Sequence, residues 1–260
     1  MRLISFVVKI FVATCLAILA FTEARATHLI GSDMYYTYLG GNQYEITLIV
    51  YRECGPANTQ GTDFDDEIFL GVFSTTTNQL INVYDVFLNF TTVQNVPVIM
   101  TNPCGTPPPD LCVEEATYTQ VMTLPSSTGH IISWQRCCRN PTISNLQNFG
   151  GTDNPGMTAT VFIPGDLEEN IPANNSSPIF QEFPPVALCA NFDFFFDHSA
   201  IDLDGDDLVY SFCAPFDGGG ATGGGGAPDS PVPNPPTNPP YLPIPYAAGY
   251  SSDYPIASNP

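Results

Sequence analysis

The clearest shortage in this sequence is positive charge. Its 260 residues include 6 lysines and arginines against 26 aspartates and glutamates, a formal net charge of −20. Nucleic acid is excluded as a partner, because almost nothing is present to neutralise phosphates. Anionic membrane surfaces would also repel such a chain. A strongly acidic surface does attract divalent cations.

Long apolar runs are also scarce. The longest spans residues 10–21, after Arg2 and Lys9, and small residues follow it. This order is typical of a secretory signal peptide, which we expect over residues 1–26; the alternative is an N-terminal membrane anchor. No later stretch is long enough to span a membrane. We therefore expect an exported chain from Thr27 on, which has no lysine and a net charge near −22 (3 basic and 25 acidic residues).

Helical periodicity with caps at both ends is absent. Short segments rich in β-branched and aromatic residues alternate with Pro, Gly, Asn and Asp, which is typical of strands and turns. Residues 33–39 and 43–51 flank Gly40, Gly41 and Asn42, and together they predict a β-hairpin. The second strand should place four residues on one face: Tyr44, Ile46, Leu48 and Val50. The pattern predicts an all-β fold of tandem Ig-like or cadherin-like β-sandwiches, the second incomplete.

Composition divides the exported chain into parts. We expect an N-terminal β-sandwich domain over residues 27–165 and a polar linker over residues 166–177. A truncated cadherin-like β-domain is expected over residues 178–260. Within it, the Gly- and Pro-rich stretch 218–240 predicts a long flexible loop. This stretch is not a phosphate-binding loop, because such a loop needs a lysine.

Seven of the 8 cysteines follow the signal peptide. In an exported protein most of them should be oxidised. Cys104 and Cys112 bracket a proline-rich segment that can close on itself, so we expect them to pair. We also expect Cys189 to pair with Cys213, because both lie in the second domain.

The motif "QRCCRN" contains the adjacent cysteines Cys137 and Cys138. We expect one of them to pair with Cys54, which leaves one thiol over. Neighbouring residues on a strand point to opposite faces, so one sulfur should face the core and the other should face away. Zinc binding is the alternative, but adjacent cysteines fit the usual ligand spacing poorly.

The basic residues of the exported chain are Arg52, Arg136 and Arg139, and each lies within two positions of a cysteine. Arginine is the cation best suited to bidentate pairing with buried carboxylates. We interpret these three residues as internal counter-ions in structural ion pairs rather than as a ligand-binding patch.

The segment "SAIDLDGDDLVYS" places Asp202, Asp204 and Asp206 at alternate positions, with Gly205 allowing a tight bend. Dense oxygen ligands suit calcium, which takes six to eight of them at about 2.3–2.6 Å. The spacing is not that of an EF-hand, because Gly and Glu are missing from their required positions. A solvated acidic turn between strands is the alternative interpretation.

"NNSSPIF", followed by "SAIDLDGDD", resembles the opening of cadherin-like extracellular repeats. The resemblance implies that Asn174 and Asn175 are linker ligands of a structural Ca²⁺ ion, with Asp202 and Asp204 as the Asp-x-Asp pair. The ion would lie between two domains and stiffen their junction. This linker offers neutral Asn where cadherins supply at least one Asp, which should weaken binding toward about 10⁻⁴–10⁻³ M.

A wider resemblance covers nearly the whole exported chain. It rests on "HLIGSDMYYTYLGGNQYEITLIVYREC", "GHIISWQRCCRNPTISNL", "NSSPIFQEFPPVALC" and "PYLPIPYAAGYS", which occur in this order. These segments are similar to the N-terminal region of large Bacteroidota cell-surface proteins, gliding-motility-associated or type IX-secreted, with PKD-like or cadherin-like repeats. The resemblance implies a secreted or cell-surface location and a role in adhesion or surface architecture.

No motif predicts catalysis. Asp197 to Ser199 contains the residue types of a catalytic triad, but consecutive strand residues point to alternate faces. We therefore expect a non-enzymatic, calcium-stiffened module of a bacterial adhesin or gliding-motility-associated surface protein. Its partner would be an extracellular glycan or protein, or another cell-surface component. The alternative is an accessory carbohydrate- or peptide-binding module of a secreted hydrolase.

Overall fold

The computed structural model describes the chain over defined stretches: residues 29–55, 63–89, 92–98, 107–125, 127–140, 142–147, 155–165, 174–189, 192–218 and 232–256. The expected signal peptide (1–26), part of the expected linker (166–173) and Cys104 lie outside them. Within these stretches the regular elements are all strands. No helix there is long and apolar enough to cross a membrane.

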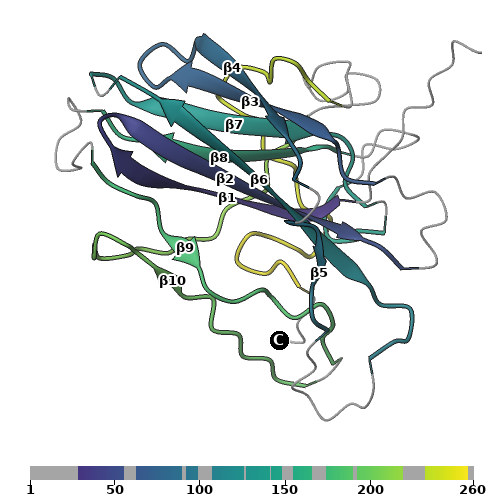
Figure 1. The fold of residues 1–260 in the computed structure, drawn as a ribbon. Helices are drawn as coiled ribbons and strands as arrows, with labels where there is room; N and C mark the ends of the chain where they lie inside the picture. The colour runs from purple at the N-terminus through teal and green to yellow at the C-terminus, as the bar shows by residue number, and fades with distance from the viewer. Residues whose placement is uncertain are drawn as a thin grey trace, which may run out of the picture.

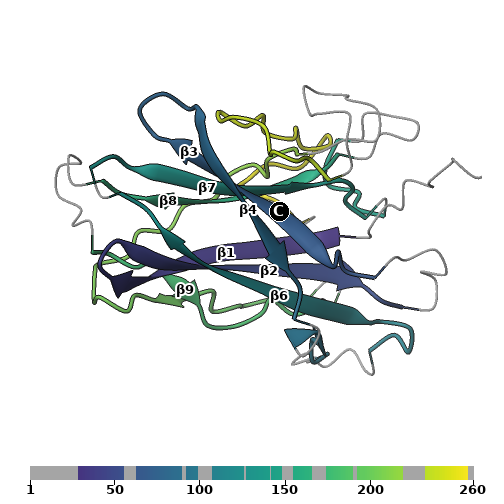
Figure 2. The ribbon, with the colours of Figure 1, turned by 45° about the horizontal axis from the view of Figure 1, so that its top comes forward.

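Two four-stranded antiparallel sheets face each other (Figures 1 and 2). The first has the order β1 (Leu29–Gly40), β2 (Gln43–Glu53), β6 (Val113–Thr123), β5 (Gln94–Asn95). The second has the order β4 (Leu80–Phe87), β3 (Glu67–Ser74), β7 (His130–Arg136), β8 (Met157–Ile163). A separate two-stranded ladder joins β9 (Ile179–Phe180) to β10 (Ala200–Ile201). The predicted all-β class is confirmed.

The expected hairpin forms the start of the first sheet. Its turn holds three consecutive residues at positive φ, Gly40 at 95°, Gly41 at 59° and Asn42 at 63°. Glycine adopts this region without a steric penalty and Asn tolerates it better than most residues, which explains why the chain reverses there. Both strands extend beyond the predicted ranges, because β1 pairs with β2 as far as Leu29 opposite Arg52.

One core fills the space between the two sheets. The four residues expected on one face of β2 are all buried: Tyr44, Ile46, Leu48 and Val50, none more than 3 % exposed. The facing sheet contributes alternate residues of β3 and β7, among them Ile68 and Trp134. Burying a large apolar side chain typically stabilises a fold by about 1.5–3 kcal/mol, so this shared core is the main source of stability.

The chain after Ser177 does not form a second sandwich within the described residues. Its regular structure there is the β9–β10 ladder, which lies beside the first sheet in Figure 1. The tandem arrangement therefore stays a prediction.

The C-terminal part of the chain instead returns to the second sheet. Residues 232–240, expected to belong to a flexible loop, lie on its outer face, where Thr237 donates two hydrogen bonds to Gln135 Oε1, at 2.8 and 2.9 Å. Because this face is covered, Gln135 is only 2 % exposed and Ser133 is fully buried. Further on, the Ile244 N–H donates to the Pro215 carbonyl. The flexible-loop prediction is therefore wrong for residues 232–240, since a strand face with polar side chains offers hydrogen bonds to the proline-rich chain.

Candidate functional site

The expected linker residues Ser176 and Ser177 are held against the edge of the first sheet. Ser177 Oγ accepts a hydrogen bond from the Tyr36 N–H at 2.8 Å, and the Ser177 N–H donates to the Tyr36 carbonyl at 3.0 Å. Ser176 Oγ accepts from the Tyr38 N–H at 3.2 Å. β1 is an edge strand, and its outward N–H groups need partners. The two serines supply them and fix the linker on the sandwich.

The acidic segment forms a tight loop organised by Asp202. Its Oδ1 accepts hydrogen bonds from the backbone N–H groups of Asp204, Gly205 and Asp206, at 2.8, 2.9 and 3.2 Å. Gly205 has a φ of 83°, which an L side chain rarely adopts. One oxygen of Asp202 therefore shapes the turn, and these bonds do not engage its second oxygen.

The loop and the linker meet at Ser176. Its N–H donates to Asp204 Oδ2 at 2.5 Å. Next to it, the Asn175 side chain donates from Nδ2 to the Ser176 carbonyl, at 2.7 Å. The carbonyl oxygen Oδ1 of Asn175 is buried and has no hydrogen-bond partner among the described residues. A buried oxygen without a partner is costly, so this atom is a candidate ligand for a cation or an acceptor for a donor.

Negative charge surrounds the Tyr36 hydroxyl at this junction. Burial raises the pKa of the Tyr36 hydroxyl, and the carboxylates of Asp204 and Asp202 raise it further, although a hydrogen bond with Asn175 opposes them. The junction thus gathers three of the predicted ligands around Ser176: Asn175, Asp202 and Asp204.

Two predicted ligands take a different place. Asn174 is exposed, and Asp206 takes part in the loop through its backbone N–H, which donates to Asp202 Oδ1. No group of three Asp, Glu, His or Cys side chains that could hold a metal occurs in the part of the chain that the structure describes. A calcium ion at the junction would therefore need the Asn175 carbonyl, backbone oxygens and water beside the two carboxylates, which suits its six to eight oxygen ligands.

A second feature is a groove of about 650 Å³ on the outer face of the first sheet. Its floor comes from β1, β2 and β6, and one wall comes from residues 179–186 together with His198. Tyr51 of the floor contacts Phe183 of the wall, with ring centroids 4.7 Å apart. Sequence reasoning missed this groove, because residues 179–186 carry no signal that they lie over β1.

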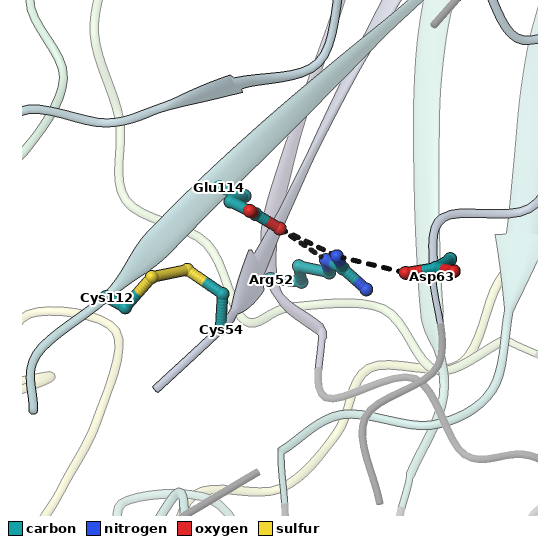
Figure 3. Close-up of a disulfide and its surroundings, with 5 residues drawn as sticks. All are labelled: Arg52, Cys54, Asp63, Cys112 and Glu114. Carbon is teal, nitrogen blue, oxygen red and sulfur yellow. Dashed lines mark hydrogen bonds and ion pairs between the residues drawn. A yellow bond between two sulfur atoms is a disulfide. The ribbon is translucent and has the colours of Figure 1, made fainter. Parts of the chain in front are cut away.

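The expected counter-ion Arg52 lies inside a small polar cluster (Figure 3). It donates from Nε and Nη2 to Glu114 Oε2, at 3.0 and 2.7 Å, and its Nη2 lies 3.6 Å from Asp63 Oδ1. The Phe64 ring lies under the guanidinium, 4.6 Å from the carbon Cζ to the ring centroid. Arg52 is thus paired across the β2–β6 ladder, where it stands opposite Glu114.

Arg136 forms a fork-shaped pair with Asp65. Its Nε donates to Asp65 Oδ2 at 2.6 Å and its Nη2 to Oδ1 at 2.9 Å. Arg136 is only 5 % exposed. Planar bidentate pairs of this kind are the strong ones. The pair holds the segment before β3 to the end of β7.

Arg139 is held mainly by backbone carbonyls. It donates to the Gly156 carbonyl at 2.9 Å and to the Phe216 carbonyl at 3.3 Å. Burial lowers the pKa of Arg139 to about 10, and the nearby Asp217 carboxylate opposes the shift. Asp217 accepts from the Gly156 and Gly218 N–H groups at 2.7 and 2.8 Å. Arg139 and Asp217 together anchor the returning chain to β8, and nothing in the sequence signals their meeting.

The disulfide pairing differs from the sequence prediction. Cys54 is bonded to Cys112, with the Cα atoms 5.0 Å apart, so neither expected pairing of these two residues is correct (Figure 3). The reason lies in the β2–β6 ladder, where Glu53 stands opposite Val113. That register places Cys54, one residue after β2, beside Cys112, one residue before β6.

The adjacent residues Cys137 and Cys138 are bonded to each other and are 0 % and 5 % exposed. Because both sulfurs are oxidised, neither is a zinc thiolate. Cys189 is disulfide-bonded, but Cys213 is a free, exposed thiol. The expected Cys189–Cys213 bridge is therefore wrong, and the left-over thiol belongs to Cys213 rather than to the "QRCCRN" motif.

In comparisons with known proteins, no family model, curated protein or solved structure matched this chain.

Proposed function

We propose that this chain is a non-enzymatic module of a secreted or cell-surface bacterial protein, in which a Ca²⁺ ion stiffens the junction at Ser176. The observation that carries the proposal is the meeting of the linker with the acidic loop. The Ser176 N–H donates a hydrogen bond to the Asp204 carboxylate. The buried side-chain carbonyl oxygen of Asn175, the preceding residue, has no hydrogen-bond partner among the described residues.

A cation at this junction would use oxygens that the hydrogen bonds leave over. Asp202 Oδ1 accepts hydrogen bonds from the loop backbone, and Asp204 Oδ2 accepts one from the Ser176 N–H. The second oxygen of each carboxylate is therefore available to a metal. The Asn175 carbonyl adds a neutral ligand. Because Ser176 and Ser177 are also bonded to β1, an ion here would join the acidic loop rigidly to the sandwich.

The proposed location and role have separate support. Two disulfides among the described residues favour an oxidising compartment. The sequence resemblance to Bacteroidota surface proteins, gliding-motility-associated or type IX-secreted, favours adhesion or surface architecture. The net charge of −20 suits a calcium-rich exterior rather than a nucleic-acid partner.

The second candidate function is an accessory binding module of a secreted hydrolase. The groove on the first sheet favours it, since a concave site of about 650 Å³ lined by aromatic and carboxylate side chains is the size of a ligand site.

Glycan and peptide substrates incubated with the chain should show no turnover. Turnover that is lost on substitution of one carboxylate pair would contradict the non-enzymatic assignment.

The calcium proposal is tested by thermal unfolding of the full chain with and without Ca²⁺. We expect calcium to raise the melting temperature of the parent and Asp204→Asn to abolish the rise. Asp253→Asn removes the same charge from another exposed position, outside the acidic loop in sequence, and should keep the rise. Absence of any calcium-dependent shift, or equal loss in both variants, would contradict the site.

A further inference from the structure

The groove on the outer face of the first sheet has a strongly one-sided charge. Among the described residues its lining includes the carboxylates of Asp33, Glu115 and Glu182 but no lysine or arginine, and His198 is the one basic group there. Anionic ligands are excluded by this lining. A cationic ligand is favoured, and the net charge of the whole chain adds to the attraction.

Two of these carboxylates approach one tyrosine from different strands. Asp33 comes from β1 and Glu115 from β6, where Glu115 stands opposite Tyr51 of β2. Asp33 stands opposite Ile49, two positions before Tyr51 on β2. Burial raises the pKa of the Tyr51 hydroxyl, and the charges of Glu115 and then Asp33 raise it further. Burial also raises the pKa of Asp33 itself. A half-buried carboxylate of this kind gains from a bound cation, because the cation replaces the lost solvation.

Aromatic rings line the same space. Tyr51 and Phe183 meet at 51° with centroids 4.7 Å apart, and Phe180 stacks on His198 at 4.1 Å. Ring faces attract ammonium and guanidinium groups, most strongly where water is partly excluded. Carboxylates combined with ring faces suit the side chains of arginine and lysine, because a cation gains the long-range attraction of the charge as well as the hydrogen bonds that a neutral sugar hydroxyl could also donate.

The volume indicates how much of a ligand enters. A groove of about 650 Å³ is larger than one side chain and accommodates a short stretch of peptide. We propose that this groove binds a basic peptide segment of a partner protein, with an arginine or lysine side chain held between Asp33, Glu115 and the Tyr51–Phe183 rings. The extracellular location of the partner is the part of this inference that rests on the proposed function. The groove itself shares no residue with the calcium junction.

The test uses the full chain and fluorescent hexapeptides of alternating arginine and alanine. A matched peptide carries citrulline, which keeps the shape of arginine without its charge. We expect the arginine peptide to bind and the citrulline peptide to bind at least about tenfold more weakly, a difference that corresponds to one good charged contact. Equal binding of both peptides would overturn the proposal, and so would stronger binding of a neutral hexasaccharide that displaces the peptide.

Variants separate the groove from the general negative charge. Asp33→Asn and Glu115→Gln should each weaken binding of the arginine peptide about tenfold. Asp85→Asn removes one charge from an exposed position on β4 in the other sheet and should leave affinity unchanged. Equal weakening by Asp85→Asn would overturn the site. Far-ultraviolet circular dichroism of each variant checks folding, and Tyr51→Leu, which keeps both carboxylates but removes the ring, should also weaken binding.

The same samples distinguish this inference from the calcium proposal. Peptide affinity is measured in calcium and in chelator, beside the melting temperature. Peptide binding without a calcium-dependent melting shift supports the groove and contradicts the calcium junction. A calcium-dependent melting shift without peptide binding supports the calcium junction and contradicts the groove.

Discussion

Ser176 donates its backbone N–H to the carboxylate of Asp204, 28 positions further along the chain, at 2.5 Å. This bond joins the linker to the acidic loop at the same serine whose hydroxyl caps the edge of β1. The loop is therefore placed beside the sandwich rather than extended into solvent. Rigid placement of two carboxylates and one amide carbonyl is the condition that a structural cation site needs.

The attachment of the linker to β1 should contribute measurably to stability. Ser177→Ala removes the acceptor of the buried Tyr36 N–H, and an unsatisfied buried donor costs about 1–3 kcal/mol. Urea unfolding of the variant should show that loss. Ser251→Ala removes a serine acceptor from an exposed turn and should cost much less. Equal effects of the two changes would contradict the role of Ser177.

The Arg136–Asp65 pair should be among the most sensitive polar contacts of the fold. Asp65→Asn leaves the guanidinium of Arg136 buried beside a neutral group, and breaking a buried pair typically costs about 3–5 kcal/mol. Chemical unfolding measures this change. Asp63→Asn is the matched control, because the Asp63 side chain is 98 % exposed and lies 3.6 Å from Arg52, so little change is expected.

Peptide mapping of the non-reduced, exported chain tests the disulfides. We expect a cross-linked peptide that joins Cys54 to Cys112, an oxidised pair within the single peptide containing Cys137 and Cys138, and alkylation of Cys213. A peptide that joins Cys112 to Cys104 would contradict the structure.

Removal of the Cys54–Cys112 bridge should destabilise the sandwich. The double change to alanine frees a loop with a sequence separation of 58, which corresponds to about 4 kcal/mol by the loop-entropy relation. Cys213→Ser is the control and should leave the free energy of unfolding nearly unchanged, because its thiol is exposed and unbonded. A negligible loss in the double variant would show that the sheet register alone holds these two strand ends together.

Alkaline stability should depend on Tyr241. Burial raises its pKa from 10.0 to about 12, so the folded state holds the proton more tightly than the unfolded state does. The resulting stability is complete below pH 10 and is lost as the pH rises toward 12. Tyr241→Phe should therefore unfold at a higher pH than the parent. Tyr254→Phe, at an exposed position, should match the parent in pH titrations followed by circular dichroism.

Much of the first sheet was predictable from local pattern. Alternation along residues 43–51 identified the buried face of β2, and the Gly40–Asn42 turn identified its hairpin partner. Both features depend on residues close together in the chain, where the two-residue period and the φ preferences of glycine act directly. The resemblance placed Asn175 and Asp204 at one calcium site, which stays a prediction; in the structure it is Ser176, the neighbour of Asn175, that is hydrogen-bonded to Asp204.

The sequence by itself determined the all-β class, the alternation of buried and exposed positions, and the scarcity of positive charge that favours internal ion pairs such as those of Arg52 and Arg136. The tertiary structure alone decided which strands are neighbours. The β2–β6 ladder paired Cys54 with Cys112 and Arg52 with Glu114, and the return of the chain to β8 placed Asp217 near Arg139. Alternation is a local property of a strand, but strand order depends on how two whole sheets bury one core, so the sequence carries no short-range signal for these contacts.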